Sequence, residues 1–521
     1  MTTVQEEREP VETMPKHAML ELAITLPPRG SGAVMRVLHR ELRAAILDGR
    51  LKPGLRLPST RILAESWGVS RNTVMGAYDL LLSEGYLFAR HGAGTYVAET
   101  LPLRAERAAI VDEIETEPDA RLNALWRSPP PYLGKPWVSS MAPSHAIFRL
   151  GVPDTASFPF HIWRRLLARS LRALAKVPAA YVEAQGRPLL REAIANHVSF
   201  ARAVACRPED VVVTAGTQQA FDLLARILVT AGRSTVALED PGYPPLRAAF
   251  VAAGAKLAPV PVDAEGLIVE RLPADTRVIC VTPSHQFPLG VAMSMRRRAE
   301  LLEFARANGA VVIEDDYDGE FRFGATPRDA LQTLDRSGSV FYVGTFSKSL
   351  FPGIRLGFVV APPWARRALI TAKQCSDWHS PVMEQDALAA FISEGHLARH
   401  VRKMRKLYSE RRELMMSSLQ THFSPWLEAI PSSGGMHLTA LVRESVDIEA
   451  IMRSARQRNM DVRSLRTFWA NGDGQAGLVM GYGSTGPEAL TEGLLQLRRL
   501  FPASAPARVV RGSSRLVAAS R

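Results

Sequence analysis

The chain has 521 residues, 46% of them apolar, which is enough to bury more than one hydrophobic core. Its 64 Lys and Arg residues outnumber 52 Asp and Glu residues, and the net charge of +12 favours a polyanionic partner. Three scattered cysteines exclude a disulfide framework and a cysteine-based metal site, and no apolar run reaches the roughly 20 residues of a membrane span. We therefore expect a multidomain protein of the reducing cytoplasm with no membrane partner.

Charge and composition divide the chain into four segments. A compact module is predicted over residues 30–98, where ten Lys and Arg residues stand against five Asp and Glu residues when Arg29 is included. An acidic run and several prolines over 99–145 make helix or central strand unlikely and predict an extended linker. Residues 146–501 alternate buried-strand and helical patterns, which predicts an α/β domain with a mostly parallel sheet. Residues 502–521 have the composition of a flexible tail.

The basic module begins with three predicted helices. Its first helix carries an apolar stripe that starts at Val34 and stops near Gly49. Ser59 and Ser70 are the predicted N-caps of the next two helices, and Gly68 forms the turn between them. This order is typical of a helix-turn-helix.

The second helix of that motif has the residue types that read DNA. Arg71, Asn72 and Thr73 fall in its first turn, the part that enters the major groove, where Arg reaches guanine and Asn reaches adenine. Two short apolar strands follow around a Gly-rich tip within Gly85–Val97, which predicts a hairpin wing carrying Arg90 and His91. The module is thus predicted to be a winged helix-turn-helix.

The module closely resembles the GntR family of bacterial regulators, in the run Leu51-Lys-Pro-Gly-Leu-Arg-Leu-Pro-Ser-Thr-Arg-Ile-Leu-Ala64 and in the segments that follow it up to Val97. The resemblance implies that DNA is contacted by Arg61, Ser70, Arg71 and Thr73, with His91 and Gly92 at the wing tip. Met75 departs from the pattern, because some relatives place an arginine there. The alternative is a winged helix that serves only protein interaction and has a solvated basic face.

The second half of the chain has the residues that pyridoxal phosphate requires. This cofactor needs a lysine for covalent attachment, an acid at its pyridine nitrogen, a phosphate cup and a group on its ring oxygen. Lys348 is the candidate lysine, and the hydroxyls of Thr345 and Ser347 and the guanidinium of Arg355 are suited to phosphate. Gly216 and Thr217 follow an apolar strand and open a predicted helix, whose amides would face an anion.

The remaining two requirements are met at the end of another predicted strand. Asp315 and Tyr317 are two residues apart, which would place them on one face of the strand. Asp315 suits the pyridine nitrogen and Tyr317 the ring oxygen.

This set of motifs resembles the fold type I aminotransferases over about residues 149–500. The resemblance implies that Tyr243 approaches the cofactor, although packing of this tyrosine on the sheet is an alternative. It also implies that Tyr181 is donated to the phosphate of the partner subunit in a homodimer.

The two resemblances in this order are those of the MocR subfamily of GntR regulators, which implies pyridoxal phosphate binding, dimerisation and recognition of paired DNA half-sites. Two features depart from true aminotransferases. Phe287 stands where they usually have an asparagine, so that His285 or Gln286 would act near the ring. The segment Gly477–Tyr482 has no arginine to hold a substrate carboxylate, which makes transamination less expected.

We therefore predict a transcriptional regulator whose aminotransferase-like domain senses pyridoxal phosphate or an amine or amino-acid effector. Lys348 would attach the cofactor, and whether it is also catalytic stays open. One alternative is an active aminotransferase with a DNA-binding appendage. Another is a scaffold that binds no cofactor.

Overall fold

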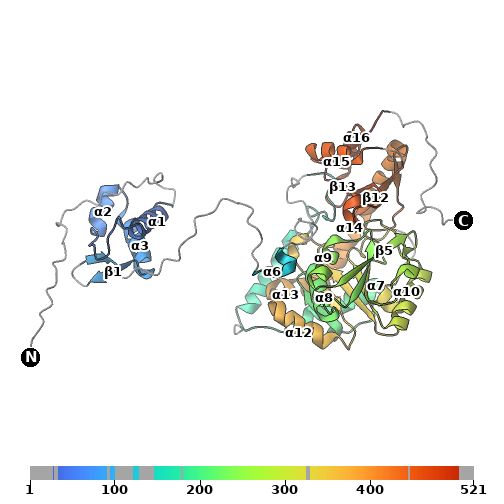
Figure 1. The fold of residues 1–521 in the computed structure, drawn as a ribbon, viewed down its shortest axis with the longest axis horizontal. Helices are drawn as coiled ribbons and strands as arrows, with labels where there is room; N and C mark the ends of the chain where they lie inside the picture. Colours follow the sequence, from blue (N-terminus) through green and yellow to red (C-terminus); the bar gives the residue numbers. More distant parts are fainter. Residues whose placement is uncertain are drawn as a thin grey trace, which may run out of the picture. The chain divides into compact units, whose positions relative to one another are not determined.

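The computed structural model describes residues 27, 33–90, 94–99, 121–127, 146–177, 180–323, 329–443 and 446–503. Two compact units are present, Met1–Asp119 and Ala120–Arg521 (Figure 1). Among the described residues, no helix is long and apolar enough to cross a membrane.

The first unit contains three helices and a hairpin: α1 (Val34–Leu47), α2 (Thr60–Trp67), α3 (Arg71–Ser83), β1 (Leu87–Arg90) and β2 (Gly94–Val97). Both predicted caps are observed, since Ser59 accepts a hydrogen bond from the amide of Ile62 and Ser70 from that of Thr73. Gly68 ends α2 in the left-handed conformation that the tight turn requires. One core, which includes Leu38, Leu63, Val74, Leu81 and Val97, joins the helices to the hairpin. The predicted winged helix-turn-helix is therefore the fold of this unit.

The second unit is built on an eight-stranded sheet of order β3-β10-β9-β8-β7-β4-β5-β6. The strands are β3 (Val211–Thr214), β4 (Thr235–Asp240), β5 (Lys256–Asp263), β6 (Gly266–Leu267), β7 (Thr276–Val281), β8 (Val311–Asp316), β9 (Val340–Thr345) and β10 (Gly357–Val360). The sheet is mixed, because β10 runs antiparallel to both β3 and β9, and β6 runs antiparallel to β5. The four pairings of β5, β4, β7, β8 and β9 are parallel, as the alternating strand and helix patterns predict.

Helices cover both faces of the large sheet: α6 (Phe160–Leu174), α7 (Pro188–Arg202), α8 (Thr217–Leu228), α9 (Pro244–Ala252), α10 (Met295–Asn308), α11 (Leu331–Leu334), α12 (Arg366–Asp377) and α13 (Val382–Ser393). Successive strand residues point to opposite faces, and both faces are buried. Val212 packs with Phe221 of α8, whereas its neighbours Val211 and Val213 pack with Trp163 of α6. The result is a three-layer α/β lobe.

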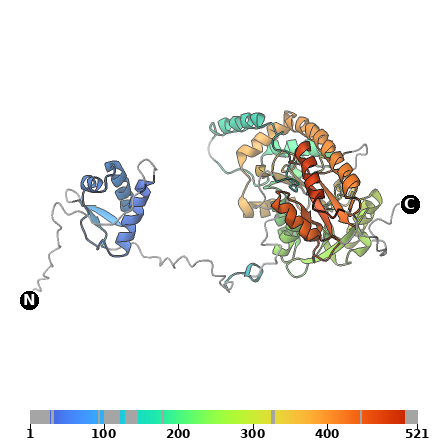
Figure 2. The ribbon, with the colours of Figure 1, turned by 90° about the horizontal axis from the view of Figure 1, so that it is seen from above.

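A smaller lobe has the sheet order β11-β12-β14-β13. Its elements are α14 (His396–Ser418), β11 (Leu427–Ala429), β12 (His437–Val442), α15 (Ile448–Gln457), β13 (Arg463–Ser464), β14 (Gly477–Gly481) and α16 (Pro487–Arg498). Figure 1 shows α15 and α16 above the large lobe, and the view from above shows the small lobe covering it (Figure 2). The small-lobe core is built around Tyr408, Trp426, Met452 and Leu494 and takes in Phe148 from the segment before α6.

The predicted linker, residues 99–145, lies largely outside the described residues, as does almost all of the predicted tail. Where the linker is described, the prediction of no helix was wrong over one turn, α4 (Ala124–Arg127). Asn123 accepts a hydrogen bond from the amide of Leu125 at 3.0 Å, and no proline lies between Pro118 and Pro129 to interrupt that turn.

Candidate cofactor pocket and nucleic-acid interface

A pocket of about 440 Å³ lies at the carboxyl ends of the parallel strands, where open α/β sheets place their ligands. Eight of the predicted cofactor residues line it: Thr217, Tyr243, Asp315, Tyr317, Thr345, Ser347, Lys348 and Arg355. Seven of them come from the carboxyl ends of β3, β4, β8 and β9, and Arg355 comes from the segment just before β10. The sheet thus brings together residues that are more than a hundred positions apart. Gly216 adjoins this set, as described below. The cofactor roles assigned to these residues remain predictions.

Lys348 projects into the pocket just beyond β9. Its Nζ donates a hydrogen bond to the carbonyl oxygen of Gly151 at 2.7 Å. Burial lowers the pKa of this amine, while the carboxylates of Asp318 and Asp315 oppose that shift. Gly151 has a φ of +71°, and a Cβ there would lie 2.8 Å from Nζ, so a glycine is required for the lysine to occupy this position. The amine is thus held by the Gly151 carbonyl, and the lowered pKa makes it easier to deprotonate than an exposed lysine.

Asp315 faces the same pocket from the end of β8. Burial, and next the charges of Asp316 and Asp318, raise its pKa well above the ordinary value. Its Oδ1 is buried and has no hydrogen-bond partner among the described residues. A buried carboxyl oxygen without a partner costs free energy, and a protonated ring nitrogen is a donor that would satisfy it. The residue therefore fits the acid that pyridoxal phosphate requires.

The predicted phosphate cup is assembled at the N-terminus of α8. Arg355 adopts a left-handed φ of +48° and donates from Nη2 to the carbonyl of Ala215 at 2.7 Å. A Cβ on Gly216 would lie 2.9 Å from that Nη2, so the glycine lets the guanidinium lie across the helix end. Thr345 and Ser347 are joined by a 3.1 Å hydrogen bond between their hydroxyls. A helix N-terminus, a guanidinium and two hydroxyls are a suitable donor set for a phosphate.

Tyr317 lies just beyond β8, and its hydroxyl is 2.9 Å from Nδ1 of His285. The same nitrogen is 2.9 Å from Oδ2 of Asp318, and all three residues are buried or nearly so. His285 therefore supports Tyr317 from behind rather than lining the pocket. This corrects the expectation that His285 or Gln286 would act near the ring.

Gln286 is turned away for a different reason: its amide nitrogen donates to the carbonyls of Pro241 and Phe287 at 2.8 and 2.7 Å. Phe287 itself lines the pocket, at an edge-to-face distance of 5.5 Å from Tyr243. An aromatic ring in this place can pack against a ligand but cannot bond to a ring oxygen.

Sequence reasoning singled out Phe287 but missed other lining residues, among them Arg149, Gly151, Met436 and His437. The signal that could have found the first two is the run Phe148-Arg-Leu-Gly-Val-Pro-Asp154, which joins the two lobes. Met436 immediately precedes β12 and His437 is its first residue, and nothing in their local sequence points to a site. Burial lowers the pKa of His437 well below its ordinary value, so this imidazole is neutral.

Tyr181 is placed outside the pocket of its own chain. It is 77% exposed, and its ring is tilted against that of Trp378 with the centroids 4.5 Å apart. Tyr181 does not line the pocket of its own chain, and its position is compatible with donation to a partner subunit. The late strand β14 is entirely buried and carries no arginine, as its sequence indicates.

The predicted DNA-reading residues lie together at the start of α3. Arg71 and Asn72 are exposed there, and Arg61 is exposed on α2. The hydroxyls of Ser70 and Thr73 are 2.7 Å apart and close the helix cap, so that Ser70 has a structural task as well. Met75, at 43% exposure, lies one turn further on. His91 and Gly92 lie outside the described residues, and Arg90 on β1 stands over the rings of Phe88 and Tyr96.

Both halves of the chain match known families. The model of the bacterial regulatory proteins of the gntR family matches residues 36–97, and that of aminotransferase class I and II matches residues 151–472. The chain is 39% identical to the probable rhizopine catabolism regulatory protein MocR of Rhizobium meliloti, over 89% of this chain and 93% of that protein. It is 33% identical to the pyridoxine biosynthesis transcriptional regulator PdxR of Corynebacterium glutamicum, over 91% and 97% of the two chains.

Among solved structures, the second unit resembles LysN, the α-aminoadipate aminotransferase of Thermus thermophilus, crystallised with N-(5'-phosphopyridoxyl)-L-leucine. The TM-score is 0.63 and the identity 30%, over 68% of this chain and 91% of that one. This likeness confirms the predicted fold type I architecture, and it leaves out the winged helix. In this chain the helix-turn-helix domain precedes the aminotransferase-like domain, and the two regulators match it over 89% and 91% of its length. Both features are typical of one group of regulators. The chain belongs to the GntR family of bacterial transcriptional regulators, among the MocR-type members that join a helix-turn-helix domain to an aminotransferase-like domain.

Proposed function

We propose that this regulator binds pyridoxal phosphate at Lys348 and that occupancy of the pocket changes its affinity for paired DNA half-sites. The observation that carries the proposal is the presence in one pocket of the half-buried Lys348 and of Asp315, whose Oδ1 has no partner among the described residues. A carboxyl buried in this way has no structural task that the described contacts explain. A protonated pyridine nitrogen would give it one.

Each pocket residue has a distinct task in holding the cofactor. When bound, pyridoxal phosphate supplies an aldehyde for a primary amine to attack and a ring that withdraws electrons. Lys348 offers the amine, and its lowered pKa keeps a larger share of it neutral at physiological pH than an exposed lysine has. Asp315 accepts the hydrogen bond of the ring nitrogen, and the cup of Gly216, Thr217, Thr345, Ser347 and Arg355 holds the phosphate. Tyr243 and Tyr317 orient the ring, with the Tyr317 hydroxyl held by His285.

The regulator acts on DNA as a homodimer in the cytoplasm. Two copies of α3 would read two half-sites, with Arg71 and Asn72 on base edges and Arg61, Ser70 and Thr73 on the backbone or bases nearby. A ligand alters DNA affinity only as far as it binds one arrangement of the dimer better than another. Binding at Lys348 would supply that preference.

The effector is pyridoxal phosphate itself, or an amine or amino acid that meets the cofactor. The relatives' printed names include regulators of pyridoxine biosynthesis and of rhizopine catabolism, so proteins of similar sequence regulate more than one process. The absence of an arginine from β14 disfavours sustained transamination, because a substrate carboxylate would lack its charged partner there. Arg149, which lines the pocket, is the residue that we expect to meet a carboxylate effector.

Fluorescence anisotropy tests the proposal on DNA taken from upstream of the protein's own gene. We expect specific binding that shifts when pyridoxal phosphate is added, measured at fixed salt against a scrambled competitor. Specific binding that ignores the cofactor would reject the cofactor as effector and leave the other amines to be tested. Steady turnover of an amino acid with a keto acid, at about 1 per second or faster, would favour the enzyme instead.

A further inference from the structure

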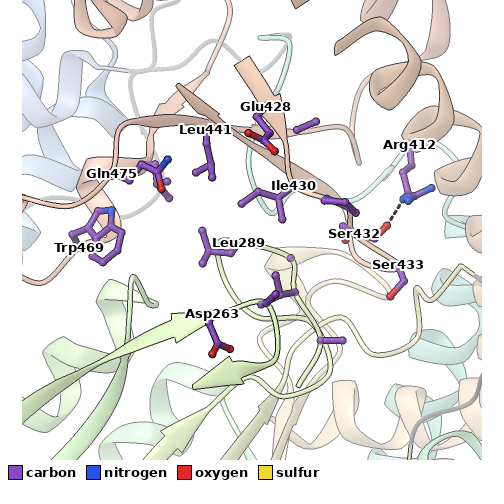
Figure 3. Close-up of a pocket in the computed structure, with 17 residues that line it drawn as sticks. Asp263, Leu289, Arg412, Glu428, Ile430, Ser432, Ser433, Leu441, Trp469 and Gln475 are labelled. Atoms are coloured by element: carbon purple, nitrogen blue, oxygen red, sulfur yellow. Dashed lines mark hydrogen bonds between the residues drawn. The ribbon is translucent and has the colours of Figure 1, made fainter. Parts of the chain in front are cut away.

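A second cavity, of about 600 Å³, lies at the seam between the two lobes of the aminotransferase-like unit. Its walls are β11 and the following loop, Leu441 of β12 and Leu465 on one side, and Asp263 and the loop 289–292 on the other (Figure 3). It shares no lining residue with the cofactor pocket. A volume of this size is suited to a small organic ligand.

The cavity combines an apolar centre with polar ends. Leu289, Ile430 and Leu441 form the centre, and Figure 3 shows Arg412 near one end and Trp469 with Gln475 near the other. The indole nitrogen of Trp469 is buried and has no hydrogen-bond partner among the described residues. An amphipathic molecule would match this distribution, with its apolar body between the two lobes.

The charged residues that line the cavity indicate that the polar group of the ligand is an anion. Two carboxylates line the cavity, but Asp263 is paired with Arg297 at 3.0 Å and Glu428 with Arg443 at 3.2 Å. Arg412 is partly buried, and only its Nε has a partner among the described residues, the carbonyl of Ser432 at 2.6 Å. Both of its terminal nitrogens remain to bind a forked anion.

A chain of contacts leads from this arginine to the cofactor pocket. Arg412 bonds to the backbone of Ser432, whose hydroxyl is 3.0 Å from Nε2 of His285. The other nitrogen of His285 contacts Asp318 and Tyr317, and both of these line the cofactor pocket. The packing around the chain is close, since a Cβ added to Gly435 would lie 2.0 Å from the His285 ring. A shift of the 432–433 loop would therefore move His285 and Tyr317 with it.

We propose that the seam cavity is a second ligand site, for an organic carboxylate with an apolar body held by Arg412, and that its occupancy is coupled to the cofactor pocket through Ser432 and His285. The carboxylate binds the guanidinium, and the body spans the seam toward Trp469. Because binding free energies are reciprocal, such a ligand changes cofactor affinity by the same factor by which the cofactor changes its own.

The first experiment measures binding of a probe by calorimetry on the full-length protein without added pyridoxal phosphate. The probe is 4-phenylbutanoate, compared with 4-phenylbutanol and 4-phenylbutylamine, which have the same body. We expect the acid to bind with a Kd of about 1 mM or tighter and the alcohol and amine at least about tenfold more weakly. No detectable binding of the acid, or equal binding of the amine, overturns the proposal.

Three variants locate the probe. Arg412→Gln keeps an N–H donor for the Ser432 carbonyl but removes the charge, and should weaken binding of the acid at least about tenfold. Arg402→Gln is the matched control on the same helix, because Arg402 is exposed and does not line the cavity. Val291→Phe should block the cavity without changing any charge. Equal binding to all three variants and to the native protein would overturn the site, and thermal melting of each variant identifies one that fails to fold.

The coupling between the seam cavity and the cofactor pocket is tested in a separate experiment. An absence of coupling can then be told apart from a failure of the protein to bind the cofactor. The probe is titrated again with pyridoxal phosphate present, whose own binding is followed by absorbance. We expect the probe Kd to change at least about threefold in the native protein and not in Ser432→Ala, which keeps the backbone carbonyl that Arg412 uses. A Kd that the bound cofactor leaves unchanged rejects the coupling. If pyridoxal phosphate abolishes probe binding both in the native protein and in Arg412→Gln, the probe occupies the cofactor pocket. That result overturns the proposed site.

Discussion

Two ionisable residues in the cofactor pocket have pKa values that burial shifts away from their values in water. Asp315 carries a raised pKa and Lys348 a lowered one, in both cases mainly because burial disfavours charge. Opposite shifts on an acid and a base in one pocket are typical of sites that bind or transform a ligand, although structural ion-pair networks also produce them. The buried Arg202–Asp316 pair behind the strand is such a network: its 2.5 Å contact lies beside Asp315 and does not line the pocket.

Asp315→Asn should weaken retention of pyridoxal phosphate. An asparagine cannot balance a protonated ring nitrogen, so we expect a loss of about 1 to 3 kcal/mol, or roughly ten- to a hundredfold in Kd. Equilibrium dialysis and the absorbance spectrum measure the effect. Glu239→Gln is the matched control, because Glu239 is also buried, with a pKa raised to about 7, but bonds to Thr282 outside the pocket. Unchanged affinity and spectrum in Asp315→Asn would assign the ring nitrogen to another group.

At the scale of elements, α3 serves both the fold and the proposed DNA contact. Its buried side, which includes Val74, Ala77 and Leu81, packs in the core of the first unit. Its first turn is capped by Ser70 and leaves Arg71 and Asn72 exposed. The cap therefore fixes the orientation of the residues that we expect to enter the major groove.

Arg71→Ala should cost about 1 to 3 kcal/mol of binding free energy on the specific site, if the guanidinium reads a base. Anisotropy with specific and random duplexes at one salt concentration separates base reading from phosphate contact. Arg50→Ala is the control, since this exposed arginine follows α1 and pairs with Asp48 at 2.8 Å. An equal loss on both duplexes for Arg71→Ala would make it a phosphate contact.

At the scale of the whole molecule, the cofactor pocket is predicted to need a second chain. Tyr181 is too exposed to serve the pocket of its own chain and is proposed to reach the phosphate of a partner. We expect Tyr181→Ala to lose pyridoxal phosphate during gel filtration and Lys348→Ala to lack a borohydride-reducible chromophore. A mixture of the two should regain retention, because a mixed dimer contains one pocket with both groups intact.

The control for this mixing experiment is a partner that carries both changes, Tyr181→Ala and Lys348→Ala. Such a partner supplies no tyrosine, so its mixture with Tyr181→Ala should stay without bound cofactor. Recovery with both partners, or with neither, would show that Tyr181 does not act across the dimer.

Local pattern was sufficient for the winged helix and for eight of the residues that line the pocket. Ser59 and Ser70 act as caps through contacts three residues away, and Lys348 is separated from Arg355 by only seven positions, so short-range chemistry identifies them. It was insufficient for His285. This side chain is absent from the pocket lining because Asp318 and Ser432, 33 and 147 positions along the chain, hold its two nitrogens.

By itself, the sequence determined the family and the two kinds of domain and predicted which residues gather in the pocket, because motifs of spaced lysine, acid, glycine and arginine residues are read locally. Tertiary structure alone decided that β10 enters the sheet antiparallel, that Asp315 Oδ1 lacks a partner among the described residues and that a cavity lies where the two lobes meet. These features depend on which distant segments meet, and a buried atom gains or loses its partner only when those segments pack.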